Sequence, residues 1–212
     1  MSRYLAVLAL AVAAVAGCTA DPDPAAGPPE PVVVQPGAPG QPGRTLDPAA
    51  ERGEQLYTLA DVRFVHGMIP HHAQALELTG LVAGRTGDPE IALLARRIER
   101  SQAEEITRME DWLAARGHPA GRHQHTGDEL MPGMLTDRQL AGLAAATGAE
   151  FDRRFLELMT YHHEGALVMV AELFTAGGGQ DGEIFQLAAH IEADQRIEID
   201  RMRRMLVGLA TG

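Results

Sequence analysis

The chain contains no lysine and only one cysteine, and 4% of its residues are aromatic. All 18 basic residues are arginine, an asymmetry to which we attach no mechanism. Aromatic residues this sparse disfavour stacking platforms for bases or sugars. The formal net charge of −11 disfavours nucleic acid as a partner, because an acidic protein repels a phosphate backbone.

Recognisable catalytic motifs are also missing from the sequence. It has no serine or cysteine nucleophile arrangement, no glycine-rich phosphate loop and no paired catalytic carboxylate motif. It has no Glu-x-x-His, the pattern that ferritin-like di-iron and di-manganese oxidases place on two of their helices. The sequence therefore favours a binding protein over an enzyme, with a ferritin-like di-metal oxidoreductase as the lesser alternative.

Residues 1–17 have the pattern of a signal peptide. Arg3 precedes an apolar run, Leu5 to Val15, that is too short to span a bilayer as a mature helix. The run ends in Val15-Ala16-Gly17-Cys18, which resembles a bacterial lipobox, a signal that is cleaved before a cysteine that carries lipid. We expect Cys18 to be lipidated and to tether the protein to a membrane, on the extracytoplasmic side of the cell envelope. No thiol then remains for a disulfide, a thiolate metal site or nucleophilic catalysis.

Residues 18–50 are rich in proline, glycine and alanine. Such a segment buries too little apolar surface to order itself, and its prolines favour extended conformations. We therefore expect a disordered spacer between the membrane anchor and a folded domain at residues 51–212.

In this domain the apolar residues recur with helical periodicity, and no stretch alternates like a strand. The pattern predicts four long helices and one short helix, near 54–84, 89–116, 137–146, 149–176 and 182–209. Helix-start signals support these positions: Asp88-Pro89, Thr136-x-x-Gln139 and Thr147-x-x-Glu150.

The domain is an internal repeat. Residues of the first half, about 54–116, recur in the second half, about 149–209, at offsets of 91 or 93 residues. Each half alone is a helical hairpin that would leave its apolar stripe in water, so we expect the halves to pack as an all-α four-helix bundle.

One repeated pattern is the ligand motif Met-x-x-His-His, which ends in His71-His72 and again in His162-His163. Apolar residues around each motif step by four and three, as on a helix face that points into a bundle core. This spacing predicts that His71 and His162 point inward and that His72 and His163 lie beside them.

The second helix of each predicted hairpin carries polar residues on its apolar stripe, at positions that match between the two halves. A glutamine and a glutamate interrupt each apolar stripe, Gln102 and Glu105 in one half and Gln195 and Glu198 in the other. Hairpin turns at about residues 87 and 179 would place Gln102 level with His71, Glu105 level with Met68, and Gln195 level with His163. All inward polar groups then fall in one layer of the bundle.

A buried layer of polar groups is costly unless its members are paired. Imidazole and thioether together suit copper in both oxidation states, and histidine with glutamate also suits zinc. The candidate metal ligands in the helices are His71, His72, His162, His163, Met68, Met159, Met169, Glu105 and Glu198. The alternative is a hydrogen-bonded network that fixes helix register or responds to pH.

The loop between the two hairpins holds further candidates. A loop of this length in a compact domain is usually functional or disordered. It contains His123-x-His125 and Met131-x-x-Met134, which could serve as mobile ligands that capture a metal at the end of the bundle.

Three motifs together resemble the CopM-like family, long catalogued as a domain of unknown function. They are Met68-Ile69-Pro70-His71-His72-x-x-Ala75, Met131-Pro132-Gly133-Met134 and Met159-x-x-His162-His163-x-x-Ala166-x-x-Met169. The resemblance covers about residues 53–210. It implies a ferritin-like helical bundle, export from the cytoplasm and, for some members, copper binding linked to copper tolerance. The sequence departs from the pattern at Leu78, where the second motif has Met169.

The leading hypothesis is therefore a lipid-anchored, extracytoplasmic protein that buffers or relays copper. The alternative from a different class is a non-metal helical module of the cell envelope that docks to a partner or responds to pH through its histidines.

Overall fold

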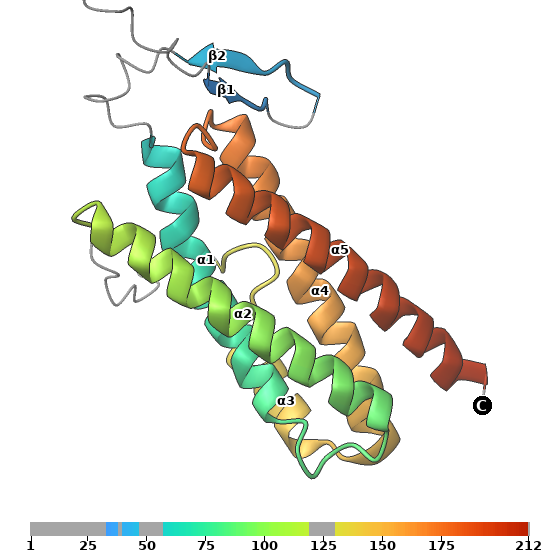
Figure 1. Cartoon of the computed structure of the whole chain (residues 1–212). Helices are drawn as coiled ribbons and strands as arrows, with labels where there is room; N and C mark the ends of the chain where they lie inside the picture. The colour runs from blue at the N-terminus through green and yellow to red at the C-terminus, as the bar shows by residue number, and fades with distance from the viewer. Residues whose placement is uncertain (1–32, 38–39, 47–56, 119–129, 212) are drawn as a thin grey trace, which may run out of the picture. The chain divides into compact units, whose positions relative to one another are not determined.

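The computed structural model describes residues 33–37, 40–46, 57–118 and 130–211, and most of these are helical (Figure 1). The predicted signal peptide, Cys18 and the loop histidines His123 and His125 lie outside the described residues. The helices are α1 (Leu59–Gly80), α2 (Pro89–Ala115), α3 (Asp137–Ala145), α4 (Gly148–Thr175) and α5 (Gly182–Thr211). The predicted all-α class and the four long helices are confirmed.

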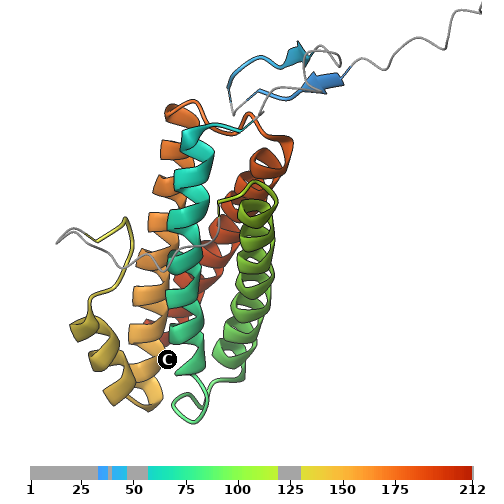
Figure 2. The ribbon, with the colours of Figure 1, turned by 90° about the vertical axis from the view of Figure 1, so that its left-hand side faces the viewer.

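The long helices form a four-helix bundle built from two hairpins. Helix α1 packs against α2, α4 packs against α5, and the hairpins meet where α1 lies beside α4 (Figure 2). The short helix α3 packs against α4 on the outside of the bundle. None of the described helices is both long and apolar enough to cross a membrane.

The helix-start signals account for three of the helix boundaries. The side chain of Asp88 accepts a hydrogen bond from the backbone of Glu90 at the start of α2, and Thr136 forms the predicted capping box at the start of α3. Helix α1 begins later than predicted, because Thr58 and Asp61 form a capping box that the sequence analysis did not use.

The predicted capping box at the start of α4 is wrong. Thr147 makes no side-chain hydrogen bond to the helix. The next residue, Gly148, has a φ of 61°, a left-handed conformation that changes the direction in which the chain enters the helix.

Part of the predicted spacer forms a small β-hairpin. Strand β1 (Val33–Gln35) pairs antiparallel with β2 (Arg44–Leu46). The side chain of Gln35 is buried and donates hydrogen bonds to the backbone oxygens of Gly179 and Gln180. The prediction of disorder was therefore wrong for these residues, because ladder and side-chain hydrogen bonds order them without a large apolar surface.

The core of the bundle is divided into two apolar clusters. One includes Leu78, Ile98, Phe155 and Met202, and the other includes Phe64, Met109, Leu173 and Ile184. On each long helix, a pair of buried polar residues lies between the residues that belong to one cluster and those that belong to the other, whereas the buried Asp61, Thr79 and Asp152 lie elsewhere. A polar layer therefore crosses the whole bundle between two apolar clusters.

Candidate metal centre

Eight buried residues make up this polar layer, two from each long helix, and each residue as a whole is at most 3% exposed. They are His71, His72, Gln102, Glu105, His162, His163, Gln195 and Glu198. The layer predicted from the sequence repeat is therefore present in the structure.

Two histidines of the layer are held by glutamates from the partner helices. Nε2 of His72 lies 2.8 Å from Oε2 of Glu105, and Nε2 of His163 lies 2.9 Å from Oε2 of Glu198. A carboxylate oxygen only accepts, so each Nε2 carries the proton and donates it. In the neutral ring this leaves Nδ1 with its lone pair free, as in the carboxylate–histidine–metal arrangement of many metal sites.

These contacts correct the predicted register of the hairpins. Glu105 was expected level with Met68 but contacts His72, about one helical turn further along α1. His163 was expected level with Gln195 but contacts Glu198, about one turn further along α5. The spacing of a stripe shows which residues face the core, whereas register depends on loop geometry that the stripe does not specify.

His71 and His162 meet at the centre of the layer. Their ring centroids are 3.9 Å apart, with 37° between the ring planes. Nε2 of His71 lies 3.0 Å from the backbone oxygen of Pro132, and because a carbonyl only accepts, Nε2 donates here too. The pair joins the two halves of the repeat.

Several buried nitrogens of the layer make no hydrogen bond of good geometry within the described part of the chain. They are Nδ1 of His71, His72 and His163 and both ring nitrogens of His162. Unpaired buried polar atoms are uncommon in native proteins and costly to stability. Unpaired imidazole nitrogens are donors of the type that metal ions bind. No three of these four histidines have ligand atoms within 4.8 Å of one another, so one ion bound by three of them would require the rings to move closer together.

Burial also keeps the central histidines unprotonated. Desolvation, followed by the charge of His72, lowers the pKa of His71 from 6.5 to about 3. Desolvation, followed by the charge of His71, lowers the pKa of His162 well below 6.5. At neutral pH a metal ion would therefore meet neutral imidazoles and would not have to displace a proton from these two rings.

Glu105 is held in its charged form. Burial alone would raise its pKa, but hydrogen bonds and charge interactions with His72 and His190 outweigh burial and lower it. The layer therefore contains a buried anionic carboxylate that stabilises positive charge on its neighbours.

A segment after the long loop, residues 131–135, contacts both α1 and α4 and reaches His71 of the polar layer. We call it the crossing segment. Gln74 on α1 anchors it with two hydrogen bonds to the backbone of Leu135, 2.7 and 3.0 Å long. A Cβ at Gly165 on α4 would lie 2.2 Å from the oxygen of Pro132, so only glycine permits this approach. The same approach brings the Pro132 oxygen to His71.

The methionine candidates surround the layer at different depths. Met131 and Met169 line a groove of about 270 Å³ together with Gly67 and Pro132. A Cβ at Gly67 would lie 3.2 Å from Cε of Met169 and 3.4 Å from Sδ of Met131, so glycine leaves the space that both thioethers occupy. Met169 is buried, in the same apolar cluster as Met68. Met159 is buried in the other cluster, and Met134 is buried in the crossing segment.

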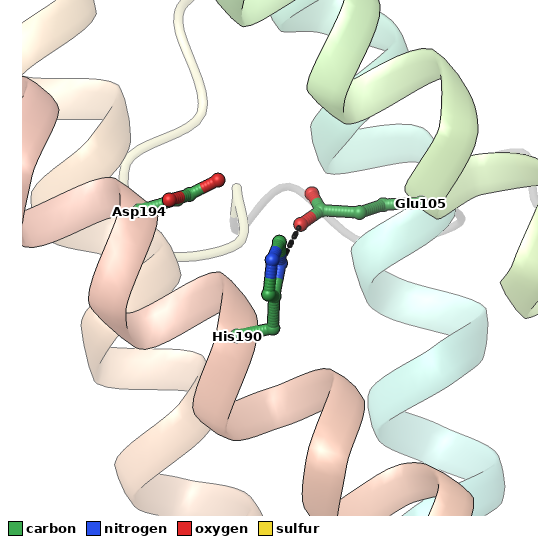
Figure 3. A group of neighbouring side chains, drawn as sticks. All are labelled: Glu105, His190 and Asp194. Atoms are coloured by element: carbon green, nitrogen blue, oxygen red, sulfur yellow. Dashed lines mark hydrogen bonds and ion pairs between the residues drawn. The ribbon is translucent and has the colours of Figure 1, made fainter.

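A further cluster of ligand-type side chains lies between α2 and α5 and shares Glu105 with this layer. In the described part of the chain, one group of three or more His, Cys, Asp or Glu residues has ligand atoms within 4.8 Å of one another: Glu105, His190 and Asp194 (Figure 3). The sequence analysis identified Glu105 but missed His190 and Asp194. They lie off the buried stripe of α5, and their counterparts in the first half, Arg97 and Ser101, do not repeat the pattern.

The sequence matches a family model described as a domain of unknown function, DUF305, over residues 61–206. The chain belongs to the DUF305 family. The structure is similar to that of a DUF305 protein from Streptomyces coelicolor that is presumed to be secreted, with 31% identity and a TM-score of 0.64. That similarity covers 71% of this chain and 92% of the other. A DUF305 fragment from Deinococcus radiodurans is 35% identical with a TM-score of 0.64, covering 71% of this chain and 97% of that one.

Another similar structure is that of CopM in its Cu(II)-bound form. It is 31% identical to this DUF305 chain with a TM-score of 0.59, over 70% of this chain and 96% of CopM. CopM has also been solved with Cu(I) and with silver. The resemblance to the CopM-like family noted in the sequence is thus confirmed.

A curated relative, the uncharacterized protein L153 of Acanthamoeba polyphaga mimivirus, is 41% identical over 56 residues. The match covers 26% of this chain and 37% of the viral protein. The chain therefore matches little more than a third of the length of this relative.

Proposed function

We propose that this protein binds copper in its polar layer and buffers or relays it outside the cytoplasm. The observation that carries the proposal is that His71, His72 and His163 each donate through Nε2 to an oxygen while their Nδ1 atoms make no hydrogen bond within the described part of the chain. Neither ring nitrogen of His162 makes a hydrogen bond there. His71, His72, His162 and His163 would hold the ion, and Glu105 and Glu198 would orient two of the rings. The copper- and silver-bound structures of CopM support the choice of metal.

The methionines favour copper over zinc. Thioether sulfur is a soft ligand that selects Cu(I), whereas imidazole serves copper and zinc alike. Met131 and Met169 face each other across Gly67 in a groove that also reaches Pro132, whose oxygen contacts His71. In this proposal a thioether from the groove binds Cu(I) together with histidines of the polar layer.

The low pKa of His71 argues against the pH-responsive alternative. A histidine with a pKa of about 3 stays neutral between about pH 5 and 7, where such switches operate. A docking module that uses no metal remains the alternative that the metal titration below tests.

We also propose that Cys18 carries a lipid that anchors the protein to a membrane. The support is the lipobox-like sequence before Cys18 and the similarity to a Streptomyces coelicolor protein that is presumed to be secreted. Metabolic labelling with a radioactive fatty acid tests this, with Cys18→Ala as the variant that should lose the label.

A competition titration tests copper binding. The full-length chain is titrated with Cu(I), Cu(II) and Zn(II) against chelators of known affinity, beside the variants His71→Ala/His162→Ala and His118→Ala. His118 is a matched control because it lies outside the polar layer and contacts Tyr57. We expect a Cu(I) Kd well below about 1 μM that the double substitution weakens and the control leaves unchanged. A Kd above this value, or one that the double substitution does not change, contradicts the proposal.

A further inference from the structure

The contact between α2 and α5 is made by polar side chains that reach across from one helix to the other. Arg97 on α2 lies 3.6 Å from Glu198 and 3.7 Å from Asp194 on α5. In the same region, Nδ1 of His190 lies 3.2 Å from Oε1 of Glu105, and Ser101 donates a hydrogen bond of 3.3 Å to Asp194. This line of polar contacts runs along the outer edge of the polar layer, because Glu105 and Glu198 belong to both.

The repeat makes the two halves of this contact directly comparable. At the offset of 93, Glu105 corresponds to Glu198, Arg97 to His190, and Ser101 to Asp194. Glu198 is therefore faced by a guanidinium, whereas Glu105 is faced by an imidazole with a carboxylate beside it. A guanidinium is always charged and has no lone pair for a metal, so one half is closed to cations and the other offers three ligands.

We propose that Glu105, His190 and Asp194 form a second metal site, the α2/α5 site, for a borderline divalent cation such as Cu(II) or Zn(II). One imidazole and two carboxylates suit such ions, and the lack of sulfur gives no preference for Cu(I). The ligand atoms lie within 4.8 Å of one another, and the three side chains point toward a common space in Figure 3.

The position of the site suits exchange with solvent. The side chain of His190 is 57% exposed, that of Asp194 is 24% exposed, and that of Glu105 is 4% exposed. The cluster therefore leads from the surface to the edge of the polar layer. The two carboxylate oxygens of Glu105 face different partners. Oε1 faces His190 in the α2/α5 site, and Oε2 accepts a hydrogen bond from His72 in the polar layer. A cation at the α2/α5 site would thus share one carboxylate with the histidine layer.

A cation at the α2/α5 site would replace contacts that its ligands make with each other and with Arg97. Nδ1 of His190 donates a proton to Glu105 in this contact. Coordination through Nδ1 therefore requires the other tautomer of the neutral ring, in which the proton is on Nε2. Arg97 lies near Asp194 but is also within ion-pair distance of Glu198, so it retains a partner when the cation takes the Asp194 carboxylate.

Two opposite substitutions test the site in the full-length chain. His190→Arg copies Arg97 into the second half and should remove one bound equivalent of Cu(II). Arg97→His/Ser101→Asp places the counterparts of His190 and Asp194 beside Glu198, and it should add one bound equivalent of Cu(II). Cu(II) stoichiometry is measured by equilibrium dialysis. In the His71→Ala/His162→Ala background, electron paramagnetic resonance should show the signal of a single imidazole nitrogen that disappears when His190→Arg is added.

Both sites are distinguishable in the same experiment. His71→Ala/His162→Ala should abolish Cu(I) binding in the polar layer while the Cu(II) equivalent that depends on His190 remains, so failure of one proposal does not imply failure of the other. The α2/α5 site is overturned when His190→Arg leaves Cu(II) stoichiometry and the imidazole signal unchanged, or when Arg97→His/Ser101→Asp adds no equivalent. The three residues would then form ion pairs only.

Discussion

The rings of His71 and His162 lie 3.9 Å apart, centroid to centroid, at the centre of the bundle, although each comes from a different half of the repeat. The contact places the two Met-x-x-His-His motifs in one site, with a carboxylate from each partner helix on the outside. The duplication therefore supplies two halves of a single polar layer.

Removal of an orienting carboxylate should weaken copper binding without unfolding the protein. Glu198→Gln keeps the shape of the side chain but loses the charge that fixes the proton on Nε2 of His163. We expect the Cu(I) Kd to rise about 10- to 100-fold. Asp200→Asn on the exposed face of α5 is the matched control, and an equal change in both variants would contradict a role for Glu198 in orienting His163.

The preference of the protein for Cu(I) over Cu(II) should depend on Met169. Met169→Leu makes the second motif resemble the first, in which Leu78 occupies this position. Because only Cu(I) gains from thioether sulfur, we expect weaker Cu(I) binding and unchanged Cu(II) binding. The swap conserves volume, so the free energy of unfolding should change by less than about 1.5 kcal/mol. Met202→Leu in the other apolar cluster is the control, and competition titrations of both oxidation states decide the outcome.

The crossing segment should require glycine at position 165. Gly165→Ala would place a Cβ 2.2 Å from the oxygen of Pro132 and 2.4 Å from Cα of Gly133, and so force the segment away from α4. We expect a loss of about 1–3 kcal/mol in the free energy of unfolding, measured by chemical denaturation. The control Gly208→Ala, where a Cβ meets nothing within 4 Å, should be neutral or stabilise helix α5 by up to about 1 kcal/mol. Equal stability of the two variants would contradict the close approach.

Stability of the metal-free protein should fall in acid. In the folded state the pKa of His71 is about 3 and that of His162 is well below 6.5, whereas both histidines take up protons near pH 6.5 once unfolded. Stability is therefore complete above pH 6.5 and is lost as pH falls below it. The loss should be about 1 kcal/mol per pH unit for each histidine, and the lowered pKa of Glu105 adds to it below about pH 4.5.

The fluorescence of Trp112, the single tryptophan, reports this unfolding because the residue is buried in one apolar cluster. His162→Asn should make the dependence on pH shallower by removing one titrating group. A free energy of unfolding that stays constant or rises between pH 6.5 and 4 would show that these histidines are not held neutral in the fold.

Much of the bundle and its polar layer followed from the sequence, because periodicity specifies which helix faces are buried. The repeat aligned His71 with His162 and Glu105 with Glu198, and all four side chains are buried in the layer. Periodicity did not specify register, so the contacts of Glu105 and Glu198 were each predicted about one turn away from their true positions.

Contacts made by the backbone, or by residues that differ between the two halves of the repeat, could not be predicted. The hydrogen bond from His71 to Pro132 depends on the path of the crossing segment, which Gly133 and Gly165 permit through their small size. His190 and Asp194 were missed because they break the repeat from which the ligand candidates were chosen. The hairpin of β1 and β2 was missed because hydrogen bonds, not an apolar pattern, hold it.

Copper K-edge X-ray absorption on the Cu(I)-loaded, full-length chain tests the central claim most directly. With one equivalent of Cu(I), the account predicts the scattering pattern of imidazole rings bound to the metal, together with a sulfur shell from methionine. The imidazole pattern should be lost in His71→Ala/His162→Ala. A spectrum without imidazole, or one that the double substitution leaves unchanged, would contradict the assignment of the polar layer as the copper site.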